Sequence, residues 1–203
     1  DGGADEDNAS LPSVALTPKL LYQFLVAEIA AQRGQLGRAA ELYLDLAHST
    51  RDPRVARRAT EMGLHGRRMD VALQAAQLWV DCEPNSSQAR QTQIGLLAAQ
   101  GRYAELKTAV AALLAAEPLQ LGPNLVRLNR LFARGGDRLA IRDLVVQVTA
   151  PYVDLPEAFY ARALAAYEAR DVEGARIAIL RALALKPDWE AAALLRVQLI
   201  ENR

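Results

Sequence analysis

Few side chains in this sequence belong to the types that carry out catalysis or hold metal ions. The two histidines, His48 and His65, lie 17 residues apart, and no grouping of Asp, Glu or Cys stands at metal-ligand spacing. The single cysteine, Cys82, excludes an internal disulfide and a cysteine-based zinc site. No phosphate loop, dinucleotide fingerprint or glycine-flanked serine nucleophile occurs. We therefore predict no catalytic residue, no metal and no cofactor in a protein that is not an enzyme.

The chemically distinctive side chain is arginine, which supplies 21 of the 24 basic residues. Its planar guanidinium favours bidentate contacts with carboxylates. Arg57 and Arg58 follow Arg54 by three and four residues, so the three share one face of a helix. Two interpretations remain open. The face either binds the carboxylates of a ligand, or is a solvated surface paired with neighbouring acids or with the acidic residues 1–10.

The composition of the whole chain favours helix and argues against two classes of partner. The 203 residues carry 24 acidic and 24 basic side chains, so no net field draws the protein to nucleic acid or to an anionic membrane. The longest uninterrupted apolar run, 109–116, is much shorter than a transmembrane segment. The 39 Ala and 32 Leu are strong helix formers, and they indicate an all-α fold.

Prolines and glycines divide the sequence at regular intervals. Spacings of 31, 34, 33 and 36 residues separate Pro53, Pro84, Pro118, Pro151 and Pro187. Because proline cannot continue a helix, each of them marks the end of a helical segment. A second set of breaks lies roughly midway, at Gly34, Gly66, Gly101, Gly135–Gly136 and Asp171. This periodicity predicts one unit of two helices, used repeatedly.

We predict five helix pairs followed by one terminal helix. The expected helices cover residues 18–33, 37–49, 53–65, 68–82, 86–100, 103–116, 122–134, 137–149, 156–170, 172–185 and 188–202. Residues 1–16 are expected to be a flexible acidic leader, and residues 17–203 a single solenoid domain.

The units resemble the tetratricopeptide repeat (TPR), which has small residues at its eighth, twentieth and twenty-seventh positions and proline at its thirty-second. The last unit matches best, with Phe159 at the fourth position and with Ala163, Ala175, Ala182 and Pro187. The first unit has Ala27, Ala39 and Tyr43 at the eighth, twentieth and twenty-fourth positions. The two units after it diverge, with Thr60, Ala72 and Trp79 and then Ile94, Leu106 and Leu113 at the small positions. The unit around Gly135–Gly136 is the most degenerate.

This resemblance implies a right-handed α-solenoid whose concave groove is lined by the first helix of each pair and binds a peptide. The repeat positions assign the following residues to that groove: Leu21, Phe24, Glu28, Arg54, Arg57, Glu61, Gln88, Gln91, Asn124, Arg127, Leu128, Tyr160, Leu164 and Tyr167. Related proteins that clamp the terminal carboxylates of chaperones use lysine and asparagine at positions that hold Phe24, Glu28 and Arg58 here. That ligand is therefore not expected.

Three phrases are similar to the amino-terminal part of bacterial TPR outer-membrane lipoproteins: residues 16–22, 26–34 and 50–59. Some of those proteins recruit substrates to a periplasmic carboxyl-terminal processing protease. The resemblance implies a scaffold in the periplasm or on the inner face of the outer membrane, with a periplasmic protease or its substrate as partner. The lipid-bearing cysteine of such proteins is not in this sequence, and an opening Asp1 in place of Met indicates a processed or trimmed product.

Other hypotheses about function and location stay open. The array could be a regulatory or targeting module of a larger enzyme, and the protein could be cytoplasmic. The terminal helix has no second helix of its own, so it is a capping face, a truncated pair or the seam of a homo-oligomer. The apolar residues available for that contact are Ala191, Leu194, Leu195, Val197 and Leu199.

Overall fold

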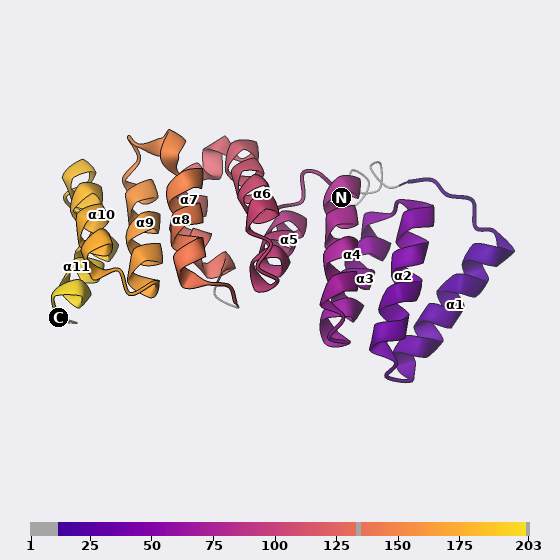
Figure 1. Cartoon of the computed structure of the whole chain (residues 1–203). Coiled ribbons are helices and arrows are strands. Elements are labelled where there is room, and N and C mark those ends of the chain that lie inside the picture. Colours follow the sequence, from indigo (N-terminus) through magenta and orange to yellow (C-terminus); the bar gives the residue numbers. More distant parts are fainter. Residues whose placement is uncertain (1–11, 133–134, 202–203) are drawn as a thin grey trace. The chain divides into compact units, whose positions relative to one another are not determined.

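The computed structural model describes residues 12–132 and 135–201, and all regular structure in this part of the chain is helical (Figure 1). The chain divides into two compact units, residues 1–96 and 97–203, and each is described by itself. Three predicted segments extend beyond these ranges: the acidic leader by its first eleven residues, and the helices expected at 122–134 and 188–202 by their last residues. The all-α prediction is confirmed.

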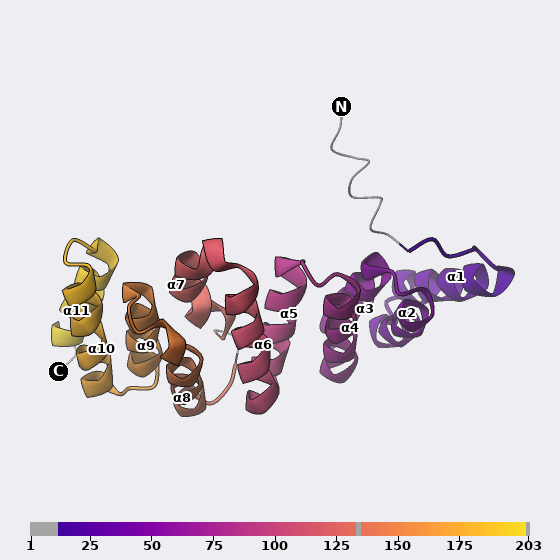
Figure 2. The ribbon, with the colours of Figure 1, turned by 90° about the horizontal axis from the view of Figure 1, so that it is seen from above.

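The first unit stacks helices that are neighbours along the chain. It contains α1 (Pro18–Gln32), α2 (Leu36–Thr50), α3 (Pro53–His65) and α4 (Met69–Cys82), and the unit boundary falls inside α5 (Ser87–Ala99). Helix α1 packs on α2, α2 on α3 and α3 on α4, and α2 also contacts α4 (Figures 1 and 2). Contacts between second helices of successive pairs are what a stack of helix pairs requires.

The second unit repeats this arrangement with two short 3₁₀ turns added. Its elements are α6 (Tyr103–Ala116), η1 (Pro118–Gln120), α7 (Leu121–Leu131), α8 (Arg138–Val148), η2 (Ala150–Tyr152), α9 (Pro156–Glu168), α10 (Val172–Leu185) and α11 (Glu190–Glu201). Helix α9 packs on α7, α8 and α10, and α11 packs on α10 (Figure 1). The predicted helices agree with these bounds to within three residues, but the sequence pattern does not predict the 3₁₀ turns η1 and η2.

The starts of several helices are fixed by side-chain caps. The Asp52 carboxylate accepts a hydrogen bond from the backbone N of Arg54 at 2.9 Å, and Pro53 occupies the first position of α3. Asp137 and Asp171 cap α8 and α10 in the same way. Such caps satisfy amide groups that have no partner inside the helix, and proline is favoured at the first helical position for the same reason.

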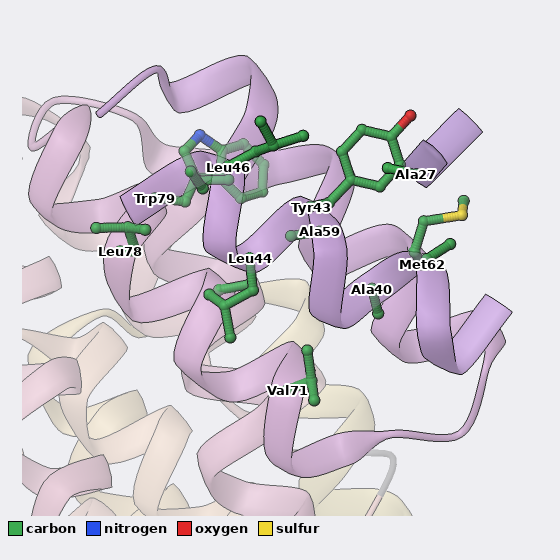
Figure 3. Packing of buried hydrophobic residues seen from close by; sticks show 14 of the residues in the cluster. Ala27, Ala40, Tyr43, Leu44, Leu46, Ala59, Met62, Val71, Leu78 and Trp79 are labelled. Carbon is green, nitrogen blue, oxygen red and sulfur yellow. The ribbon is translucent and has the colours of Figure 1, made fainter. Parts of the chain in front are cut away.

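Burial confirms the repeat positions in four of the five pairs. Ala163, Ala175 and Ala182 have no exposed surface, and neither do Ala27 and Ala39. In the divergent pairs the larger residues at these positions are also buried, between 0% and 4% exposed: Thr60, Trp79, Ile94, Leu106 and Leu113. The core of the first unit therefore mixes alanines with a few bulky side chains, among them Tyr43, Leu46 and Trp79 (Figure 3). Alanine permits close helix approach where the bulky residues leave room.

The register of the fourth pair differs from the one that the prolines suggest. With Pro151 as the thirty-second position, the small positions fall on Arg127, Leu139 and Val146, all of which are exposed. The buried residues are instead Asn129, Ile141 and Val148, two positions further along. The reason is that α8 ends at Val148 itself, whereas α4, α6 and α10 continue three residues past the corresponding buried residue. Pro151 therefore follows that residue after three positions instead of five.

The turns within pairs reach the left-handed conformation in two ways. Gly34, Gly101 and Gly136 have positive φ, but the second and fifth pairs place Arg67 (φ 55°) and Arg170 (φ 60°) there. Gly66 has φ −81°, so a different constraint requires it to be glycine. A Cβ at Gly66 would lie 2.6 Å from the backbone N of Gly37, at the start of α2. Gly66 therefore permits close approach of two backbones.

Candidate functional site

The first helices of the first unit expose apolar side chains beside a cavity. Leu21 and Phe24 on α1 are each 44% exposed, which is high for large apolar side chains. Together with Arg54 of α3 they line a cavity of about 430 Å³. The remaining lining residues come from the segment before α1 and from the ends of α1, α2 and α3: Pro12, Val14, Leu16, Leu20, Leu46, Thr50, Asp52 and Val55. Three of the predicted groove residues thus share one site.

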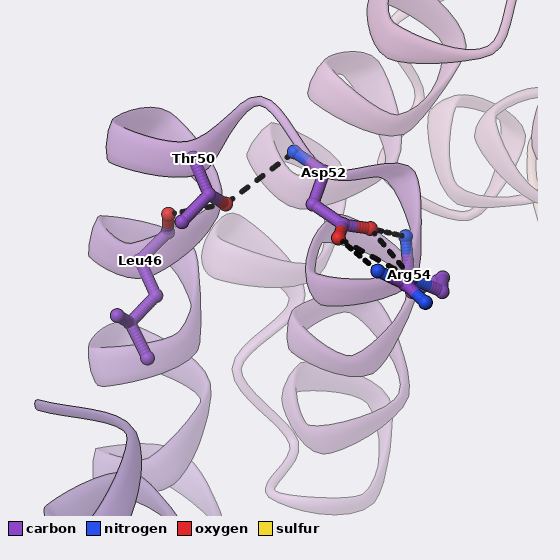
Figure 4. Close-up of polar contacts among 4 residues, drawn as sticks. All are labelled: Leu46, Thr50, Asp52 and Arg54. Carbon is purple, nitrogen blue, oxygen red and sulfur yellow. Dashed lines mark hydrogen bonds and ion pairs between the residues drawn. The ribbon is translucent and has the colours of Figure 1, made fainter. Parts of the chain in front are cut away.

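Asp52 and Arg54, which both line this cavity, form an ion pair (Figure 4). Asp52 accepts from Nη2 of Arg54 at 2.7 Å and from its Nε at 3.1 Å. The backbone N of Asp52 donates to Oγ1 of Thr50, which in turn donates to the carbonyl oxygen of Leu46. The hydrogen bonds from Arg54 hold the pKa of the Asp52 carboxyl below its ordinary value, although burial opposes them. Asp52 is therefore charged near neutral pH, and it orients the guanidinium of an arginine side chain that is 68% exposed.

The other arginines of this face also have acidic partners. Nε of Arg57 donates to Glu61 at 3.0 Å, and its guanidinium lies 5.9 Å from the ring centroid of Trp79. Arg58 lies 3.7 Å from Glu28 of α1. With Arg54 and Asp52 these form three ion pairs with no net charge. The geometry favours the second of the two interpretations made from sequence, a face paired with neighbouring acids.

Tyr43 of α2 joins this face to the core. Its hydroxyl donates to Glu28, its ring lies 5.8 Å from the guanidinium of Arg58, and Phe24 packs edge-on against it with ring centroids 6.0 Å apart. Burial, and next the hydrogen bond to Glu28, raise the pKa of Tyr43 to about 12. The buried phenol of Tyr43 therefore contacts and positions both Phe24 and Glu28.

Gln88 and Gln91 on α5 are exposed, and neither lines the cavity. Nε2 of Gln91 donates to Oγ of Ser87 on the same helix. The structure thus gives these two glutamines an accessible position without joining them to the other predicted residues of the first unit.

In the second unit, the predicted residues fall into two groups. Tyr160, Leu164 and Tyr167 are half-buried against the apolar core around α9 and α10. Tyr160 stacks on Trp189 with ring centroids 4.8 Å apart. On α7, Asn124 donates to Glu117 at 2.8 Å, while Arg127 is exposed. Arg127 lines a shallow depression with Glu157, Lys186 and Trp189.

Leu128 was assigned to the groove, and this is wrong. It has no exposed surface and belongs to the core of the second unit. The error follows from the Pro151 register: moving the assignment two positions further along α7 brings Val126 and Arg130 to the surface in place of Asn124 and Leu128. Asn129 beside them is buried, and its Nδ2 donates to the carbonyl oxygen of Ala161 in α9.

Terminal helix α11 buries one side and exposes another. Leu195 and Leu199 are buried against the core, whereas Leu194, Val197 and Ile200 are between 51% and 60% exposed. Of the five apolar residues considered for self-association, only Leu194 and Val197 present substantial surface, because Ala191 is half-buried.

Over residues 12–132 and 135–201, no three His, Cys, Asp or Glu side chains gather as a metal site would require. Within the same residues no single helix is long and apolar enough to cross a bilayer. One pair of segments, Tyr103–Ala116 with Pro118–Leu131, reaches that length and apolarity together but is bent by 97°.

No protein-family model matches the chain. Over 85 residues the chain is 36% identical to a TPR repeat-containing protein of Pseudomonas aeruginosa. The match covers 42% of this chain but 14% of that relative, so the chain corresponds to a small part of the relative's length.

Solved structures of repeat proteins also align with the chain, at low similarity. The C-terminal part of a TPR repeat-containing protein from Cytophaga hutchinsonii gives a TM-score of 0.41 at 16% identity and covers 87% of this chain and 69% of its own. MamA from Desulfovibrio magneticus RS-1 gives 0.42 at 15% identity, covering 92% and 96%. PilW, a widely conserved type IV pilus biogenesis factor, gives 0.41 at 15% identity, covering 92% and 86%.

Proposed function

We propose that the chain is a tetratricopeptide-type repeat protein and acts as a non-enzymatic scaffold that binds a partner polypeptide on the surface of its first helices. Proteins built from stacked helix pairs use these surfaces for recognition. The observation that carries the proposal is the cavity of about 430 Å³ between α1, α2 and α3, with the exposed Leu21 and Phe24 at its wall and the Asp52–Arg54 pair at its edge.

This combination suits a peptide better than a small charged metabolite. An apolar wall next to a neutral ion pair can accept a large apolar side chain and offer hydrogen bonds to the backbone beside it. Aromatic residues and arginine are the side chains that most often anchor protein interfaces. Since Arg54, Arg57 and Arg58 already have acidic partners, the apolar residues supply most of the affinity and the arginines mainly set orientation.

The location and the identity of the partner belong to the proposal as well. The three phrases that resemble bacterial outer-membrane lipoproteins support a place in the bacterial cell envelope, with a lipid anchor outside this sequence. A periplasmic protease or its substrate is the partner that this resemblance suggests. Fractionation of cells that express the full-length protein tests the location, and recovery in the soluble cytoplasm would favour the alternative, a targeting module of a larger cytoplasmic enzyme.

The binding surface can be tested by cross-linking and by paired substitutions. A photo-reactive phenylalanine analogue at position 24 should cross-link a polypeptide, and the captured partner then serves for affinity measurements. Leu21→Ser with Phe24→Ser should weaken binding at least tenfold, because the apolar wall is lost. The matched control is Tyr22→Ser with Ile29→Ser, seven residues apart on another face of the same helix and at least as exposed. Equal losses in both double variants would overturn the proposal.

Self-association is a second candidate, supported by the exposed Leu194, Val197 and Ile200 on α11. If these residues form a homo-oligomer, sedimentation velocity should show a concentration-dependent species that Leu194→Ser with Val197→Ser reduces to a monomer. A monomer at every concentration would leave the partner polypeptide as the sole proposal.

A further inference from the structure

Another cavity lies in the second unit, on a side of α9 that carries none of the predicted groove residues. Its volume is about 720 Å³, and helices α8, α9 and α10 line it. On α9, the lining residues Phe159, Arg162 and Ala166 are three and four residues apart and so form one stripe. Tyr160, Leu164 and Tyr167 form a different stripe of the same helix. This cavity is therefore separate from the surface proposed above.

Two arginines in this cavity share one aromatic ring and have no acidic partner in the part of the chain that the structure describes. The guanidinium of Arg162 lies 4.9 Å from the ring centroid of Phe159, and that of Arg181 lies 5.9 Å from it. Nε of Arg162 donates to the neutral Thr149 hydroxyl at 2.7 Å. Burial lowers the pKa of the Arg162 guanidinium, which reflects a charge held partly out of water without compensation.

A third arginine in the same cavity provides the contrast. Arg142 contacts Asp143 at 2.8 Å and Asp171 at 3.1 Å, so its charge is balanced. One end of the cavity therefore carries a satisfied ion cluster, while Arg162 and Arg181 leave positive charge unbalanced elsewhere in its lining. An anionic group is the chemically complementary occupant of that position.

The rest of the lining is apolar and follows the length of α10. Small residues leave the space open: Ala166, Gly174 and Ala178. Between Gly174 and Ala184 the lining spans ten residues of α10, or roughly 15 Å at the rise of an α-helix. Val146, Ile177 and Leu180 line it with 44%, 62% and 43% of their surface exposed. Enclosed small-molecule pockets bury their apolar lining, so exposed apolar residues along an extended cavity favour a polypeptide occupant.

We propose that this cavity is a second binding site, for a peptide segment that carries an acidic side chain next to large apolar side chains. The carboxylate lies against Arg162 and Arg181, where it receives charge-assisted hydrogen bonds. The apolar side chains of the peptide cover Val146, Ile177 and Leu180. The site does not depend on the α1–α3 cavity, so a scaffold of this kind can hold two segments at once.

Selection from a phage-displayed library of random twelve-residue peptides on the full chain tests the proposal without a known partner. The enriched peptides should place Asp or Glu beside Leu, Phe or Trp. By fluorescence anisotropy, the best peptide should bind at least tenfold more tightly than its copy with Asn or Gln in place of the acid. That difference should shrink as salt is raised, because partly exposed charges are screened.

Variants of the full chain locate the site. The double variant Arg162→Gln and Arg181→Gln should bind the selected peptide at least tenfold more weakly. It should also bind the acidic peptide and its amide copy equally well. Ile177→Glu, an exposed substitution that places a carboxylate beside the site, should have a similar effect. Two controls should leave binding unchanged: Arg176→Gln, which removes an exposed arginine of α10 that pairs with Glu173, and Leu21→Ser with Phe24→Ser, which tests the first surface alone.

Several results would overturn the inference. Enriched peptides without acidic residues would do so, as would binding that survives the double arginine variant when its circular dichroism matches the parent. Saturable binding of decanoate that displaces the selected peptide would show that the cavity takes a free anionic amphiphile instead. Loss of peptide binding in the Leu21 and Phe24 variant would place the peptide on the first surface.

Discussion

At the scale of single residues, Tyr43 does more than fill the core. It is 1% exposed, its hydroxyl donates to Glu28 of α1, and its ring lies beside Arg58 of α3. One phenol thus connects three helices and supports Phe24 at the proposed binding surface. Because its hydrogen bond requires the protonated form, its ionisation should disturb both the core and that surface.

We expect the stability of the protein to fall between about pH 10 and pH 12 through Tyr43. Its pKa is raised from 10.0 to about 12 in the folded state, so in this window the folded protein binds more protons than the unfolded chain. The free energy of unfolding then decreases as pH rises, and the contribution is complete below pH 10. Urea unfolding of the parent and of Tyr43→Phe at several pH values measures the difference, which should narrow across the window. Parallel pH profiles would contradict this assignment.

At the scale of elements, small residues decide how closely two helices cross. In the α3–α4 crossing, a Cβ at Gly63 would lie 2.8 Å from the backbone N of Ala72. In the α9–α10 crossing, Ala163 and Ala175 have no exposed surface. A larger side chain at such a position has no empty volume to enter, so the helices must move apart or the side chain must adopt a strained rotamer.

Ala163→Leu and Ala175→Leu should each lower the free energy of unfolding by about 1–3 kcal/mol, because overpacking strains the crossing. Thermal and urea unfolding monitored by circular dichroism provide the measurement. Ala193→Leu on α11 is the matched control, since Ala193 is exposed and should change stability by no more than about 0.5 kcal/mol. If all three variants melt together with the parent, the register of the last repeat is wrong.

At the scale of the whole molecule, positive and negative charges are equal in number, and the stretch richest in arginine is paired with acids. The chain carries 24 basic and 24 acidic residues. The most arginine-rich stretch, around α3, is paired with acids of its own helix and of α1. A protein that binds nucleic acid through its backbone phosphates needs a basic patch that is free to replace counterions.

We expect no binding to nucleic acid at physiological salt. Electrophoretic mobility of a 30-base-pair duplex should not change with protein up to about 10 μM, a range in which proteins with a basic surface bind DNA without specificity. A retarded band that disappears as salt is raised would contradict the expectation and would direct attention to Arg162 and Arg181.

The sequence by itself determined the helices, the turns and most repeat positions of this protein. These features depend on local chemistry: proline and capping residues end or start a helix, and alanine recurs at a period that places it in the crossings. The same local argument failed at Pro151, because α8 ends at the buried Val148 and the proline follows that residue two positions sooner than in the last repeat. The spacing of the prolines does not reveal that this helix is shorter.

Which arginines have an acidic partner depends on the packing of helices that are distant in the sequence. Arg58 pairs with Glu28 of a different helix. Arg162 and Arg181 both lie against the ring of Phe159, and neither has an acidic partner in the described part of the chain. The residues that line their cavity come from three helices, so no contiguous sequence motif predicts the cavity. Helix formation depends on residues that are neighbours along the chain. A binding surface is formed by side chains that helix packing brings together, and this packing depends on the register and contacts of several helices.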